Sequence, residues 1–109
     1  MIIRQVKNFK NQIATLKRRY PSVELDFLHE VSSFNKNKNI ALGHSIFKIR
    51  VRNSDIPCGK SGGYRVIAFY EKSKDVLLPL IIYSKRNKGN VSKSEITSSL
   101  ADALKEISS

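Results

Sequence analysis

The stretch Ile46-Phe47-Lys48-Ile49-Arg50-Val51-Arg52 alternates between apolar and cationic residues. Successive side chains of a β-strand point to opposite faces of a sheet, so the apolar residues of this stretch face a core and the cations face outward. The sequence therefore predicts a half-buried strand with three cations on its open face.

The residues before this strand follow a helical period. Apolar residues recur every three or four positions up to Tyr20, Pro21 ends that segment, and Ser22 is placed to cap a second helix. We therefore expect an N-terminal αα-hairpin with a very short turn. Its apolar positions are Ile3, Val6, Phe9, Ile13, Leu16 and Tyr20 in the first helix and Val23, Phe27, Leu28, Val31 and Phe34 in the second.

Two more strands are predicted after a loop at residues 53–63 that is rich in Gly, Pro, Asp and Ser. Residues 64–71 are rich in β-branched and aromatic residues. Residues 76–84 are apolar on both faces, which is typical of a central strand. Pro79 lacks a backbone N–H, so we expect a bulge or a local edge there.

The C-terminal region predicts a last helix. Ser92-Lys93-Ser94-Glu95 has the spacing of a capping box, and the apolar residues from Ile96 to Ile107 have a helical period. We expect one α+β domain over residues 1–109, made of an N-terminal αα-hairpin, a three- to four-stranded antiparallel sheet and a C-terminal helix. The helices are expected on one face of the sheet, and the other face is expected to be open to a ligand.

The composition indicates a polyanionic partner. Lys and Arg total 20 against 9 for Asp and Glu, which gives a formal net charge of +11. Such a charge favours nucleic acid first, a membrane surface second and an acidic protein third. The N-terminal residues lack the apolar run of a signal peptide, the apolar run 76–83 is too short to span a bilayer, and Cys58 is the single cysteine. We therefore expect a cytoplasmic protein with no membrane partner.

The candidate site is a set of cations from three strands. Antiparallel pairing brings Arg65 and Lys85 to the same end of a hairpin. The sequence contains no cluster of Cys and His residues that would indicate a zinc site. Neither His29 nor His44 is assigned a role. The candidate catalytic residues are Lys48, Arg50, Arg65, Tyr83, Lys85 and Arg86, and the candidate RNA-binding residues are Arg52, Lys60, Gly62, Gly63, Tyr64 and Lys88.

This set of residue types suits RNA cleavage without a metal or cofactor. The 2′-hydroxyl of RNA is a built-in nucleophile, arginine binds the oxygens of an anionic phosphorane, and a lysine crowded by cations has a lowered pKa and can act as a base. Tyr83 shares strand parity with Lys85, so it can orient the sugar or transfer a proton. Tyr64 can stack on a base, and Gly62 and Gly63 let a phosphate approach the backbone. Core packing is the alternative role of both tyrosines, and a solvated basic rim is the alternative for the cations.

Several of these segments together resemble the RelE/HigB branch of the RelE/ParE toxin superfamily. The resemblance covers nearly the whole chain, and its most specific part is Gly59-Lys60-Ser61-Gly62-Gly63 before Arg65. The similar segments are Phe47 to Arg52, Gly59 to Ile67, Ile82 to Arg86, Val91 to Ile96, Ile2 to Lys7 and Tyr20-Pro21-Ser22.

The resemblance implies the toxin of a type II toxin–antitoxin system, with helices on one side of an antiparallel sheet. Such toxins cleave mRNA, commonly in the ribosomal A site, and a cognate antitoxin neutralises them. By resemblance, Arg65 stabilises the transition state, Lys48 and Arg50 match basic residues of the preceding strand, and Arg86 matches an arginine after the central strand. Some RelE-type toxins have a functional tyrosine between that arginine and the final helix, whereas residues 87–94 contain none.

Two other functions are compatible with the sequence. A ParE-like protein would poison a DNA-topology enzyme by contact, and the cations of the sheet would then form a protein-binding rim. A basic RNA-binding module without catalysis is the other alternative. The density of Lys and Arg around Arg65 favours the nuclease.

Overall fold

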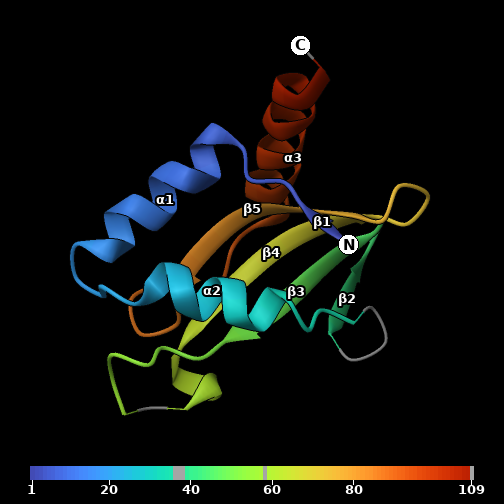
Figure 1. Cartoon of the computed structure of the whole chain (residues 1–109). Coiled ribbons are helices and arrows are strands. Elements are labelled where there is room, and N and C mark those ends of the chain that lie inside the picture. Colours follow the sequence, from blue (N-terminus) through green and yellow to red (C-terminus); the bar gives the residue numbers. More distant parts are fainter. Residues whose placement is uncertain (36–38, 58, 109) are drawn as a thin grey trace.

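A five-stranded mixed sheet in the order β1-β5-β4-β3-β2 is the frame of the computed structural model (Figure 1), which describes residues 1–35, 39–57 and 59–108. Three helices accompany the sheet, so the α+β class expected from the sequence is confirmed. The described elements are β1 (Ile2–Ile3), α1 (Lys7–Lys17), α2 (Val23–Val31), β2 (Ile40–Gly43), β3 (Ile46–Val51), a short 3₁₀ turn (Lys60–Gly62), β4 (Tyr64–Glu71), β5 (Val76–Ser84) and α3 (Lys93–Ser108).

The sheet differs from the expected three- to four-stranded antiparallel sheet in both number and direction. β1 pairs in parallel with β5, with Ile2 opposite Val76, whereas the other pairs are antiparallel. The sequence predicted Ile3 in the first helix, because Ile3 fits the apolar spacing of that helix. That prediction is wrong, since Ile3 belongs to β1. The segment of β2, Ile-Ala-Leu-Gly, has no alternation of apolar and polar residues by which to predict a strand, and all four residues are exposed.

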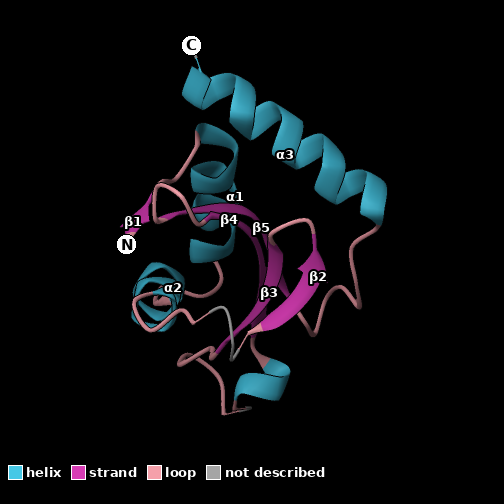
Figure 2. Ribbon diagram, turned by 90° about the vertical axis from the view of Figure 1, so that its right-hand side faces the viewer, coloured by secondary structure: helices cyan, strands magenta, loops and turns pink. Residues whose placement is uncertain are grey.

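Helices α1 and α2 cover one face of the sheet, where α1 packs against β5 and α2 against β3 (Figures 1 and 2). The sequence led us to expect α3 on that same face, and this prediction is wrong. The helix begins on the opposite face and crosses toward the start of α1 (Figure 2). There the carboxylate of Glu106 accepts hydrogen bonds from the backbone N–H of Lys7 at 3.0 and 3.2 Å. We call the face opposite α1 and α2 the outer face.

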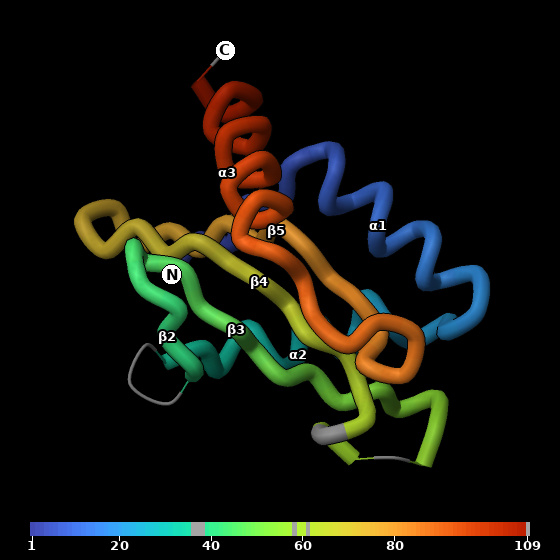
Figure 3. The backbone as a smooth tube through the Cα atoms, turned by 180° about the vertical axis from the view of Figure 1, so that it is seen from behind, coloured from blue at the N-terminus to red at the C-terminus, as the bar shows by residue number. Residues whose placement is uncertain are grey.

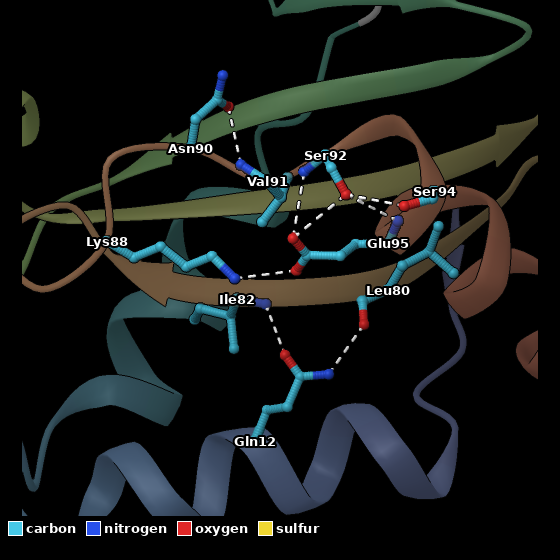
Figure 4. Close-up of polar contacts among 9 residues, drawn as sticks. All are labelled: Gln12, Leu80, Ile82, Lys88, Asn90, Val91, Ser92, Ser94 and Glu95. Atoms are coloured by element: carbon cyan, nitrogen blue, oxygen red, sulfur yellow. Dashed lines mark hydrogen bonds and ion pairs between the residues drawn. The ribbon is translucent and has the colours of Figure 1, made fainter.

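The helix ends show one wrong and one correct prediction. Ser22 precedes α2 but makes no side-chain cap, because its N–H and hydroxyl both donate to the carboxylate of Asp55. Residues 92–95 do form the predicted capping box at the start of α3 (Figure 4). Ser92 Oγ accepts from the Glu95 N–H at 3.1 Å, and the Glu95 carboxylate accepts from the Ser92 N–H at 3.3 Å.

Strand β5 is interior, as predicted, and its register shifts beside Pro79, so the predicted bulge is also confirmed. β1 pairs with only the first two residues of β5. Farther along, the side chain of Gln12 takes the place of a neighbouring strand (Figure 4). Its Nε2 donates to the carbonyl of Leu80 at 3.0 Å, and its Oε1 accepts from the N–H of Ile82 at 2.9 Å.

Candidate functional site

Three strands place the main candidate residues in one row across the outer face. Arg50 of β3 is directly opposite Arg65 of β4, and Arg65 is directly opposite Tyr83 of β5. Lys48 lies two residues before Arg50, so it points to the same face. We call Lys48, Arg50, Arg65, Tyr83 and Lys85 the basic face.

Figure 3 is turned by 180° from Figure 1, so the outer face points toward the viewer. The segment that joins β5 to α3 returns over this face, and its Val91 is buried and lines a cleft together with Lys48 and Ile67. Arg50 and Lys85 are exposed cations of the basic face, and Lys48 and Arg65 are more enclosed.

Arg65 is buried and held in place. Only 5% of its surface is exposed, and its Nη1 donates to the carbonyl oxygens of Lys60 at 3.0 Å and Tyr64 at 3.1 Å. Burial and the neighbouring Arg50 lower the pKa of Arg65, while Tyr83 acts in the opposite direction. An arginine stays charged at physiological pH even so, which makes Arg65 a fixed, preorganised cation.

Lys48 is half-buried among other cations. Burial is the main cause that lowers its pKa, and the charges of Lys85, Arg65 and Arg50 lower the pKa further. A lowered pKa raises the fraction of neutral amine at a given pH. This makes Lys48 a candidate to accept a proton.

Tyr83 is a neutral phenol beside Arg65. Burial raises its pKa, against the effects of Arg65 and Lys88. Its hydroxyl is buried and has no hydrogen-bond partner among the residues that the structure describes. Leaving such a group unsatisfied costs about 1–3 kcal/mol. Tyr83 lies in the row directly beside Arg65, and its role in orienting a sugar or transferring a proton stays a prediction.

Lys85 lies at the predicted end of the sheet. Its backbone N–H donates to the carbonyl of Gly63 at 2.9 Å, which brings it to the Arg65 end of the hairpin as expected. Its Nζ donates to the carbonyl of Gly89 at 2.8 Å. Arg86 and Lys88 are exposed in the following turn, and Lys88 pairs with Glu95 at 2.9 Å (Figure 4).

Two predicted RNA-binding residues have other roles. Tyr64 is fully buried on the helix-covered face, where its ring meets Tyr20 edge-on at 5.9 Å between centroids, so it does not stack on a base. Gly63 serves the packing of the chain, because a Cβ there would lie 2.1 Å from the carbonyl oxygen of Val51. Gly62 is half-buried at the end of the 3₁₀ turn.

The other candidates lie at the rim of the basic face or away from it. Arg52 is exposed just after β3, and Lys60 Nζ pairs with the carboxylate of Glu30 on α2 at 2.7 Å. No sequence pattern predicts this ion pair, because the two residues belong to segments with unrelated patterns. His29 is exposed on α2, and His44 lies in the β2–β3 turn at the far end of β3 from Arg50. Cys58 is outside the described residues.

The comparisons with known proteins found no relative. No protein-family model matches the chain, and no curated protein or solved structure matches it at a significant level. Among the described residues, no three His, Cys, Asp or Glu side chains form a group that could hold a metal ion. No helix within the described ranges has the length and apolar character needed to cross a membrane.

Proposed function

We propose that this chain is a metal-independent endoribonuclease of the RelE/HigB type, the toxin of a type II toxin–antitoxin pair. The observation that carries the proposal is the row of Arg50, Arg65 and Tyr83, with Lys48 beside it, on the outer face of the sheet. The resemblance in sequence supports the same function. The helix-covered sheet and the returning segment before α3 are compatible with a RelE-like arrangement.

The proposed reaction is attack of a 2′-hydroxyl on the adjacent phosphate. The neutral amine of Lys48 accepts the proton of the 2′-hydroxyl as the 2′-oxygen bonds to phosphorus. Arg50 and Arg65 stabilise the negative charge of the phosphorane. The bond from phosphorus to the 5′-oxygen then breaks, and the ammonium of Lys85 gives that oxygen a proton. The products are a 2′,3′-cyclic phosphate and a 5′-hydroxyl.

The proposed setting is a cytoplasm in which the chain meets mRNA on the ribosome and a cognate antitoxin. An acidic segment of the antitoxin that covered the basic face would neutralise it by charge complementarity. Because the net charge is +11, such a partner would also reduce binding to unrelated nucleic acid.

Primer extension on mRNA during in vitro translation tests this function. Wild-type protein should cut inside the reading frame, and Arg65→Ala should reduce cutting about 10²- to 10³-fold, the effect of removing one preorganised donor. Because Arg65 is buried, Arg50→Ala should be measured as well, and the folding of both variants should be checked by circular dichroism. Lys72→Ala, in the β4–β5 turn, is the matched control.

The alternative functions give other results in this assay. In-frame cuts that persist undiminished in both arginine variants would exclude the proposed site. Absence of cuts while translation continues would reject the nuclease and leave RNA binding alone, whereas inhibition of DNA gyrase without RNA cleavage would indicate the ParE-like function.

A further inference from the structure

A cleft opens at the edge of the sheet next to the basic face. β2 pairs with β3 only as far as Lys48, opposite Ile40, so among the described residues no strand pairs with the end of β3 on that side. The cleft there has a volume of about 530 Å³. Cations are most of its charged lining, and its described walls are Lys48, Arg50, Lys60, Glu30, Ser33, Asn39 and Ile40.

This cleft is continuous with the proposed cleavage site. Lys48 and Arg50 belong to both. Lys60 connects them from the other side, because its carbonyl accepts from Arg65 while its amine reaches the cleft. A strand of RNA with one phosphate on Arg50 and Arg65 can therefore continue around the edge of β3 and present its next phosphate to Lys60.

In the free protein the amine of Lys60 already forms an ion pair with a carboxylate. Glu30 contributes the carboxylate of the cleft lining, and it lies 2.7 Å from Lys60 Nζ. The side chain of Glu30 is 18% exposed and that of Lys60 is 58% exposed, so the glutamate is held by the protein whereas the lysine can turn toward solvent. A phosphodiester offers the same charge and the same acceptor oxygens as this carboxylate.

We propose that the cleft is a second phosphate subsite, for the nucleotide adjacent to the scissile one, and that Glu30 is its built-in competitor. Binding of RNA exchanges the Glu30–Lys60 ion pair for a phosphate–Lys60 ion pair. The inference rests on the RNA-binding part of the proposed function, and it does not depend on which residue accepts the proton.

The test uses a short fluorescein-labelled single-stranded RNA with 2′-O-methyl groups, which binds but has no nucleophile for cleavage. Fluorescence anisotropy with the full chain should show that Glu30→Gln binds about two- to fivefold more tightly than wild type, the range expected for one exposed ion pair. Lys60→Ala should bind less tightly, and its slope of log affinity against log salt should be shallower by about 0.7, the loss of one phosphate contact on a single strand.

Glu24→Gln is the matched control for Glu30→Gln. Glu24 is also on α2 and pairs with Lys17 at 3.5 Å. Its substitution by Gln changes the net charge of the protein by the same amount as Glu30→Gln. If Glu24→Gln improves binding as much as Glu30→Gln, or if Glu30→Gln weakens binding, Glu30 is no competitor. An unchanged salt slope in Lys60→Ala would exclude the phosphate contact.

The outcomes for the two proposals are separable. Cleavage by wild-type protein with no effect of Glu30→Gln or Lys60→Ala on binding would overturn the subsite and keep the nuclease. The expected binding shifts without any cleavage would keep the subsite and overturn the nuclease.

Discussion

Arg50 and Arg65 are directly opposed across β3 and β4, with Lys48 beside them. Like charges directly opposite each other in a sheet are destabilising. The burial of Arg65 adds to this cost, and its hydrogen bonds to the carbonyl oxygens of Lys60 and Tyr64 offset part of it. A sheet needs no such row for folding, so the arrangement supports the proposal of a polyanionic ligand.

At this scale we predict that Lys48→Met stabilises the fold by about 0.5–1 kcal/mol at neutral pH. The folded state lowers the pKa of Lys48, so its charged form costs stability below that pKa. The cost shrinks as the pH rises above the folded pKa, and the gain from the substitution should shrink with it. Urea unfolding at neutral and alkaline pH measures both effects. Lys72→Met should show neither, and a destabilised Lys48→Met would contradict the argument.

A second residue-scale prediction concerns the pH dependence of cleavage. If the neutral amine of Lys48 is the base, the rate rises with pH as Lys48 loses its proton. Arg50→Gln removes one of the charges that lower the pKa of Lys48, so the rising limb should move to higher pH, and the rate should fall as well. Single-turnover rates across the pH range measure this. In Arg52→Gln the rising part of the pH–rate profile should stay at the same pH. If it also stays at the same pH in Arg50→Gln, Lys48 is not the base.

The sequence predicted the basic residues of the site better than their partners. Alternation along one strand is enough to place Lys48 and Arg50 together, and hairpin geometry brings Lys85 to Arg65. Which face an aromatic residue takes depends on register, and register buried Tyr64 against Tyr20. The contact between Glu30 and Lys60 depends on how α2 packs on the sheet, which no local pattern contains.

At the scale of the elements, the segment between β3 and β4 is held at both ends by contacts of its described residues. Asp26 on α2 accepts from the N–H and hydroxyl of Ser54, and Asp55 accepts from Ser22, so the segment is fastened to the N-terminal end of α2. At its other end Gly63 lies against the backbone of β3. These contacts fix the route by which the chain reaches Arg65.

We predict that Gly63→Ala destabilises the protein by about 1–3 kcal/mol or more, because the added Cβ meets main-chain atoms that cannot rotate away. Gly89→Ala is the matched control, since a Cβ there has nothing within 4 Å. Thermal unfolding followed by circular dichroism measures both variants. Equal stability of the two would show that the backbone near Val51 moves to make room.

The elements with strong local signals were predicted correctly. The period changes at β3, the capping box starts α3, and Pro79 marks a bulge in β5. β1 and β2 were missed, because one has two residues and the other is exposed throughout. α3 was placed on the wrong face, because an amphipathic period shows that a helix packs but not on which layer.

At the scale of the whole molecule, charge should govern how the protein binds RNA. Each phosphate contact on a single strand contributes about 0.7 to the slope of log affinity against log salt. Lys85→Ala should reduce that slope by about this amount, whereas Lys72→Ala, at the opposite end of the sheet, should leave it unchanged. Anisotropy titrations over a salt series measure the slopes. Equal slopes in the two variants would mean that the net charge, and not the basic face, holds the RNA.

The side chain of Gln12 has a further consequence for the behaviour of the protein at high concentration. It occupies one N–H and one carbonyl on the side of β5 that β1 leaves uncovered. An unoccupied strand edge is a template on which another chain can add a strand. Gln12 therefore helps to keep copies of this protein from joining their sheets into fibres, and a chain that lost it would be expected to aggregate before it lost its fold.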